Sequence, residues 1–199
     1  MRNKYVYGIM TAAVVAGVLI AVGLLSSESA SYDKPSNVAR MVLGAQDAAV
    51  VVQEYSDFQC PACKAAAPEV KRLIQAYGDS IRFEYHHYPL TQRHANAFSA
   101  ALASECANDQ GKFWQMHDKI FEKQDQLTKG NLKSMAGELG LDQKSFDACF
   151  DSRAYADTVN ADMERGKQLG VSGTPTFFVN GTETKLADLE RTIQDLLAQ

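Results

Sequence analysis

The sequence predicts an α/β fold in which a βαβ unit, a block of helices and a C-terminal ββα segment follow one another. Three observations support this order. Two short apolar runs flank one amphipathic helical pattern, an Ala-rich stretch of 80 residues has helical spacing, and an Asn-Gly pair separates two strand-like runs. The chain has 199 residues, 46% of them hydrophobic, and this balance excludes a disordered chain.

An uncharged segment precedes the part of the chain that is expected to fold. Residues 5–25 contain no charged side chain, and a helix of this length would span roughly 30 Å, the thickness of a bilayer core. Arg2 and Lys4 precede it, so the positive-inside rule places the N-terminus in the cytoplasm. We therefore expect residues 1–25 to form a cytoplasmic stub and a transmembrane signal anchor. A cleaved signal peptide is the alternative, although the residues at Ser27–Ala30 fit a cleavage site poorly.

The rest of the chain is predicted to be a flexible linker and one domain outside the cytoplasm. Residues 26–37 are rich in Ser and lack apolar periodicity, as linkers do, and residues 38–199 are enough for one domain. Two of the 20 Lys and Arg residues precede the apolar segment, so residues 26–199 carry 18 basic and 24 acidic groups, a net charge of −6. This negative balance argues against nucleic-acid binding.

The βαβ unit is predicted from two apolar runs and the helical pattern between them. Residues 48–55, AAVVVQEY, have the composition of a buried strand, and residues 60–77 have helical apolar spacing that ends at Gly78. Residues 81–88 form the second strand, which Pro89 ends. Because a βαβ unit joins them, these two strands should be parallel.

A helical block and a C-terminal hairpin follow. The block covers about residues 91–170, with breaks expected at 109–111, 128–131, 140–142 and 151–153. Residues 175–179 resume strand character, Asn180-Gly181 predicts a two-residue turn, and residues 182–185 form the partner strand. Residues 186–197 have the spacing of an amphipathic helix.

Two cysteines three positions apart stand at the start of the first helix. The unpaired N–H groups and positive dipole of a helix N-terminus stabilise a thiolate at Cys60, which thiol–disulfide exchange requires. Pro61 suits the first helical turn, where no N–H is needed. Half a zinc site and an inert disulfide are the alternatives, but only the adjacent His86 and His87 could add a ligand pair. We predict a redox-active pair, Cys60 and Cys63, without a metal or a cofactor.

Other titratable residues receive narrower predictions. Glu54 lies inside the first apolar strand, where a carboxylate is costly to bury, and a proton relay to Cys63 would explain it. An exposed strand end is the alternative. Cys106 and Cys149 are expected to form a structural disulfide in an oxidising compartment, with two free thiols or a second redox pair as alternatives. The histidines are expected to be packing or surface residues, namely His86, His87, His94 and His117.

Four motifs, taken together, resemble the DsbA-like thiol-disulfide oxidoreductases, which have a thioredoxin fold with a helical insertion. They are EYSDFQCPAC at 54–63, YPL at 88–90, QGKFWQMHD at 110–118 and VSGTPTFFVNG at 171–181. The resemblance covers about residues 45–198. It implies that Cys60 is the exposed nucleophile, Cys63 its buried partner and Glu54 the acid beneath them. It also implies that Thr174 and a cis-Pro175 face the disulfide, although the residues alone favour a trans peptide.

The resemblance further implies an activity on exported proteins that contain Cys residues. The disulfide would oxidise substrate dithiols, with Pro61, Ala62, Thr174 and Pro175 next to the bound peptide, and a membrane redox partner would regenerate it. A reductase or isomerase is the alternative with the same active site. A non-catalytic holdase or copper-binding module is the alternative of another class. Ala62 stands where many members of the family have a His, which weakens the case for a very oxidising potential.

Overall fold

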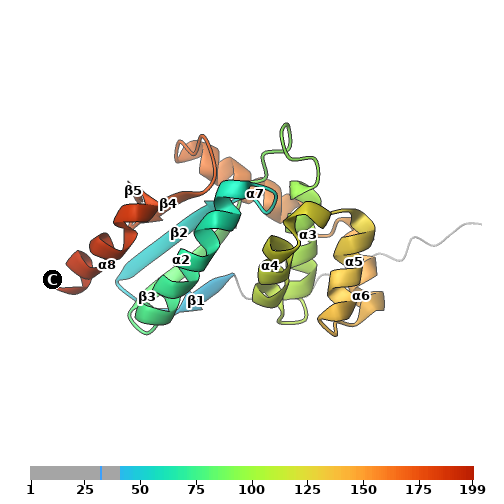
Figure 1. Ribbon diagram of the computed structural model, residues 1–199, viewed down its shortest axis with the longest axis horizontal. Coiled ribbons are helices and arrows are strands. Elements are labelled where there is room, and N and C mark those ends of the chain that lie inside the picture. Colours follow the sequence, from blue (N-terminus) through green and yellow to red (C-terminus); the bar gives the residue numbers. More distant parts are fainter. Residues whose placement is uncertain (1–31, 33–40) are drawn as a thin grey trace, which may run out of the picture. The chain divides into compact units, whose positions relative to one another are not determined.

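The computed structural model describes residue 32 and residues 41–199, which form one compact unit. This unit has a central sheet with helices on both faces and a helical insertion beside it (Figure 1). The predicted transmembrane segment, residues 5–25, and most of the predicted linker lie outside the described residues. Among the residues that are described, no helix combines the length and the apolar character needed to cross a membrane.

The five strands have the order β1-β3-β2-β4-β5. At the centre, β2 (Val50–Ser56) and β3 (Ile81–His87) are parallel, as predicted from the βαβ unit. β4 (Thr176–Val179) pairs antiparallel with β2, and β5 (Thr182–Thr184) pairs antiparallel with β4. β1 (Val42–Gly44) pairs antiparallel with β3 and was not predicted, because three partly exposed residues give too short a pattern.

Two groups of helices surround the sheet. α2 (Pro61–Tyr77) connects β2 to β3, and α8 (Leu189–Leu197) ends the domain after a short 3-10 turn, η2 (Leu186–Asp188). The other helices lie between β3 and β4: α3 (Ala97–Asn108), α4 (Phe113–Glu122), the 3-10 turn η1 (Gln124–Gln126), α5 (Lys129–Glu138), α6 (Gln143–Ser152) and α7 (Ala156–Gln168).

Apolar side chains place α2 and α8 on one face of the sheet and α7 on the other. Leu73 of α2 and Ile193 of α8 share a small cavity with Val52 of β2, which contributes to that face. On the opposite face, α7 comes so close to Tyr55 and Tyr88 that Gly166 has no room for a larger side chain. Tyr55 and Tyr88 belong to a second apolar cluster that lies beneath α7.

The insertion begins later than predicted, and its breaks fall close to the expected positions. The first helix starts at Ala97 rather than at residue 91, because residues 91–96 form turns and a loop that bonds to the active-site loop. Thr128 and Asp142 act as N-caps of α5 and α6, and each side chain accepts a backbone N–H of its helix. The predicted breaks thus coincide with helix starts at these two places.

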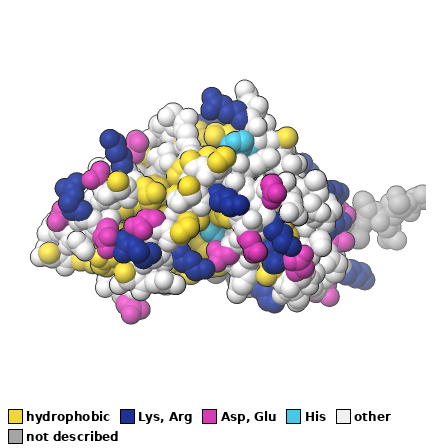
Figure 2. All heavy atoms as spheres, in the orientation of Figure 1, with side chains coloured by type: hydrophobic (Ala, Val, Ile, Leu, Met, Phe, Trp, Pro, Cys, Tyr) yellow, Lys and Arg dark blue, Asp and Glu magenta, His cyan; other side chains and the backbone are white. Residues whose placement is uncertain are grey.

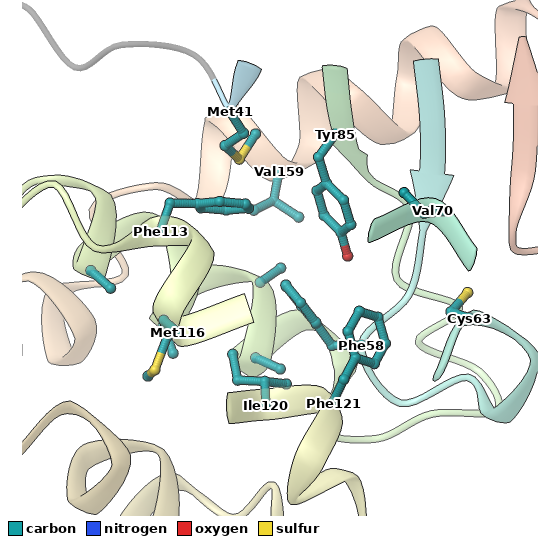
Figure 3. Close-up of a cluster of buried hydrophobic side chains, with 14 of the residues drawn as sticks. Met41, Phe58, Cys63, Val70, Tyr85, Phe113, Met116, Ile120, Phe121 and Val159 are labelled. Carbon is teal, nitrogen blue, oxygen red and sulfur yellow. The ribbon is translucent and has the colours of Figure 1, made fainter. Parts of the chain in front are cut away.

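Aromatic side chains join the insertion to the sheet. Tyr85 of β3 lies between the two parts, with its ring centroid 5.7 Å from that of Phe113 and 5.5 Å from that of Phe58 (Figure 3). Phe58 in turn packs against Phe121 of α4, and their ring centroids lie 5.1 Å apart. The core is therefore continuous from the sheet into the insertion, and it passes directly beneath the cysteine pair.

Candidate active site

The cysteine pair stands at the N-terminus of α2. Cys60 occupies the N-cap position, its side chain makes no cap hydrogen bond, and Pro61 follows as the first helical residue. Both Cys60 and Cys63 are free thiols in this structure. Cys60 is the more accessible of the two, but it is only 7% exposed, whereas Cys63 is fully buried. The pair therefore opens to solvent only through Cys60.

The loop before β4 faces Cys60. The thiol of Cys60 donates to the carbonyl oxygen of Thr174 at 3.3 Å, and the Thr174–Pro175 peptide bond is cis. Pro61 and Ala62 are exposed next to the pair, and hydrophobic side chains gather around this end of α2 (Figure 2). The structure thus brings together the four residues that the resemblance implies for substrate contact.

Burial dominates the chemistry of the inner thiol. It raises the pKa of Cys63 to about 12, while the backbone N–H of Asp57 and the nearby Ser56 side chain act in the opposite direction. The Asp57 nitrogen lies 3.4 Å from the Cys63 sulfur. A thiol in this environment gives up its proton only when a base accepts it nearby.

Glu54 is buried in β2 on the same face as Ser56. It is 3% exposed, so the alternative of an exposed strand end does not hold. Burial raises the pKa of Glu54 to about 7, and the nearby Ser56 side chain partly opposes this rise. The Ser56 side chain lies near enough to affect both Glu54 and Cys63, but its buried hydroxyl has no hydrogen-bond partner among the described residues. Ser56 was not among the predicted site residues, because its only signal in the sequence is its spacing of two residues from Glu54.

Two glutamine side chains hold the loop between β2 and α2. Gln124 of η1 donates to the carbonyl oxygens of Phe58 and Cys60, at 3.0 and 2.9 Å. Gln59 accepts a hydrogen bond from the backbone N–H of Asn96 at 2.8 Å. These contacts join residues far apart in sequence, and no pattern in the sequence predicts them.

One histidine lies next to the cysteine loop. His94 pairs with the buried carboxylate of Asp57 at 2.8 Å, next to the cysteine loop. His86 stacks on Tyr55 and also faces Asp162, and His117 packs among aromatic rings and faces Asp118. In residues 32 and 41–199, no group of three or more His, Cys, Asp or Glu side chains is arranged to hold a metal ion.

The other two cysteines are bonded to each other. Cys106 of α3 and Cys149 of α6 form a disulfide with a Cα–Cα distance of 5.8 Å. Both residues are fully buried in the insertion. This bond connects two helices and leaves Cys60 and Cys63 as the free pair.

Comparisons with known proteins agree with this arrangement. The family model Thioredoxin_4, described as Thioredoxin, matches residues 36–197. BdbD from Bacillus subtilis is 27% identical, with a TM-score of 0.72 over 80% of this chain and 94% of that one. DsbA2 from Pseudomonas aeruginosa is 25% identical, with a TM-score of 0.63 over 82% of this chain and 96% of that one.

Curated relatives with higher identity are much longer proteins. The Na(+)/H(+) antiporter NhaA 3 from Salinispora tropica is 43% identical over 140 residues, which are 70% of this chain but 21% of the antiporter. The antiporter NhaA from Herminiimonas arsenicoxydans is 36% identical over 78% of this chain and 25% of its own length. The chain thus spans about a fifth to a quarter of these relatives. On the family match and the solved structures together, this chain belongs to the Thioredoxin_4 family and has a DsbA-like thioredoxin fold.

Proposed function

We propose that this protein is a thiol–disulfide oxidoreductase that oxidises the dithiols of exported proteins through a Cys60–Cys63 disulfide. The observation that carries the proposal is the contact of the Cys60 thiol with Thr174, at the positive end of α2 and beside a cis proline. A buried thiol and a buried acid with a pKa near neutrality lie behind it. This set of groups suits a reaction in which thiolates attack and leave.

The reaction proceeds in two exchanges. A substrate thiolate attacks the Cys60 sulfur, the Cys60–Cys63 bond breaks, and Cys63 leaves as a thiolate that takes a proton from Glu54. A second substrate thiolate then attacks the substrate sulfur of the mixed disulfide, and Cys60 leaves. The substrate is oxidised by two electrons, and the protein ends as a dithiol. Because burial makes a free Cys63 thiolate costly, the nearby acid is needed in the first exchange.

The substrate peptide would lie along the loop before β4. Thr174 precedes the strand, so an extended peptide beside it can pair its backbone with the loop as an added strand. Pro61 and Ala62 offer small exposed apolar surfaces on the other side of Cys60. Since these contacts involve backbone and small side chains, we expect broad specificity.

The proposed location is the outer side of a membrane. The uncharged residues 5–25 support a signal anchor, and the Cys106–Cys149 disulfide suits an oxidising compartment. Turnover there requires a membrane redox partner that reoxidises the dithiol. The substrates are exported or secreted proteins that contain Cys residues.

Replacement of the outer cysteine tests the proposal. Cys60→Ser should abolish oxidation of a reduced, unfolded test protein, because Cys63 is buried and the other two cysteines are bonded to each other. The matched control is the double variant Cys106→Ser/Cys149→Ser, which removes two cysteines and should keep the activity while it remains folded. Activity retained by Cys60→Ser would disprove the assignment.

An equilibrium titration against glutathione determines the direction of the reaction. A reduction potential well above that of thioredoxin would support an oxidase, and a potential close to it would support a reductase or isomerase. If Cys60 and Cys63 formed no reversible couple, a binding module would replace the enzyme as the interpretation. The glutathione couple in the same solution serves as the reference potential.

A further inference from the structure

The carboxylate of Asp57 is buried beside the cysteine pair and accepts three hydrogen bonds. The residue is 1% exposed. One carboxylate oxygen accepts from the backbone N–H of Gln59 at 2.7 Å, and the other accepts from the N–H of Leu90 at 2.7 Å and from Nδ1 of His94 at 2.8 Å. A buried carboxylate with this many donors is held in one orientation.

The backbone of the same residue touches both cysteines. The Asp57 N–H donates to the Cys63 sulfur at 3.4 Å, and the Asp57 carbonyl oxygen accepts from the Cys60 N–H at 3.1 Å. Any rotation of the Asp57 peptide would therefore change what surrounds the Cys63 sulfur. The side chain, through its three donors, fixes this peptide.

His94 supplies the one side-chain donor of the three. Its loop is attached to the cysteine loop a second time, because the N–H of Asn96 donates to the Gln59 side chain. His94 is also more exposed than Asp57, with 19% of its side chain accessible. It can therefore be replaced with less risk to folding than Asp57.

We propose that Asp57 and His94 form a positioning pair that aims the Asp57 N–H at the Cys63 sulfur and thereby speeds the attack of Cys63 on a mixed disulfide. The inference rests on the proposed function, since it concerns the rate of one step of thiol–disulfide exchange. Neither residue contacts the reacting sulfur through its side chain. Both act through the backbone that they hold.

The step can be isolated with the reduced protein and oxidised glutathione. Cys60 first attacks glutathione disulfide, forms a mixed disulfide and releases one glutathione thiolate. Cys63, after giving its proton to Glu54, then attacks the Cys60 sulfur. The bond to glutathione breaks, the Cys60–Cys63 bond forms, and the second glutathione leaves as a thiolate. Glutathione disulfide is reduced and the cysteine pair is oxidised.

The experiment measures both steps by rapid quenching, alkylation and mass spectrometry. His94→Ala should slow the second step about tenfold, the effect of weakening one hydrogen bond to a charged group, and leave the first step unchanged. His94→Asn keeps an N–H donor close to the place of Nδ1 and should restore the second step to within about twofold. If His94 had only a structural role, His94→Ala would lower the melting temperature but would not slow the second step more than the first.

Asp162→Asn is the matched control. Asp162 of α7 also accepts from an imidazole Nδ1 and a backbone N–H, those of His86 and His87, but this group lies on the other face of the sheet. The Asp162→Asn variant should carry out both steps at the wild-type rate. Asp57→Asn should slow the second step at least as much as His94→Ala if it folds, and the His94 variants decide the matter if it does not.

Three results would overturn the inference: a wild-type second step in His94→Ala, an equal slowing of both steps, or the same slowing in Asp162→Asn. Failure of the proposed function looks different. In that case the wild-type protein itself forms no mixed disulfide with glutathione, and no variant can be compared. Failure of the inference is therefore measured in the variants, and failure of the proposed function is measured in the wild-type protein.

Discussion

Glu54 and Asp57 are two buried acids three residues apart that the fold surrounds in different ways. Asp57 accepts hydrogen bonds from two backbone N–H groups and His94. Glu54 lies in the apolar interior, and burial raises its pKa to about 7 from 4.5. Asp57 therefore suits a fixed structural role, and Glu54 suits proton exchange near neutral pH.

The raised pKa makes stability depend on pH. Between about pH 4.5 and 7 the folded protein keeps a proton on Glu54 that the unfolded chain releases, so the free energy of unfolding falls as pH rises through this range. The shift corresponds to about 3 kcal/mol. Glu54→Gln should lose this dependence and be more stable than the wild type at pH 8. Urea unfolding of the reduced proteins at pH 5 and pH 8 measures both effects.

Glu183→Gln on β5 serves as the control for that comparison, because Glu183 is exposed. Its stability should follow the wild-type pH dependence. Parallel pH curves for Glu54→Gln and the wild type would contradict the assignment of the titration to Glu54.

At the residue scale, the sequence identified the residues of the candidate site better than the residues that hold them in place. Cys60, Cys63 and Glu54 have local signals, since their helix start and apolar strand are visible in the sequence. Gln124 and His94 reach the same loop from positions 64 and 37 residues away from their partners. Contacts of this kind arise from tertiary packing, which a single sequence does not encode in any local pattern.

The close approach of α7 to the sheet depends on Gly166. A Cβ atom there would lie 2.7 Å from the Tyr88 ring and 3.0 Å from the Tyr55 ring. Gly166→Ala should therefore cost about 1–3 kcal/mol of stability, despite the higher helix propensity of Ala. Chemical denaturation measures the loss.

Gly130 of α5 provides the matched comparison. A Cβ atom at Gly130 would meet nothing within 4 Å. Gly130→Ala should leave the stability unchanged or raise it by up to about 1 kcal/mol. Equal effects of the two substitutions would contradict the packing argument for α7.

The disulfide between α3 and α6 should contribute strongly to stability. It closes a loop with a sequence separation of 43 residues, for which the loop-entropy model gives about 4 kcal/mol. Removal by Cys106→Ala/Cys149→Ala, in a background with Cys60→Ser and Cys63→Ser, should lower the unfolding midpoint in urea. The parent with the bond intact should show the same loss when a reductant is added, whereas the double variant should not respond.

At the element scale, the longer elements were predicted and the shortest strand was missed. α2, β2 and β3 have apolar spacing over seven or more residues, and their predicted ends differ from the observed ones by two residues or fewer. β1 has three residues, and only its pairing with β3 makes it a strand. The start of α3 was also misplaced, because the loop before it is shaped by side chains from another part of the chain.

At the scale of the whole molecule, the order of elements was predictable, whereas the order of strands in the sheet was not. The βαβ unit, the helical block and the hairpin all occur where the sequence indicates. In the sheet, β2 lies between β3 and β4, and β4 pairs antiparallel with β2. No local pattern in the sequence predicts this order or this pairing. The resemblance to a known family implied the thioredoxin fold, but no strand order was predicted from it.

The N-terminal segment carries the remaining prediction for the whole protein. If residues 5–25 form an uncleaved anchor, the native protein should fractionate with membranes and retain these residues. Intact mass spectrometry of the membrane fraction measures this directly. A new N-terminus between Ser27 and Ser31 would instead indicate a cleaved signal peptide.

The two hydrogen bonds of Gln124 have a consequence for protein engineering. Because this side chain from the insertion donates to carbonyl oxygens of Phe58 and Cys60, the insertion is part of the active-site framework. A chimaera that grafts the insertion of another family member onto this sheet must supply a donor at the same place. Without one, two carbonyl groups beside the reactive sulfur lose their shared partner, so the insertion and the cysteine loop have to be exchanged together.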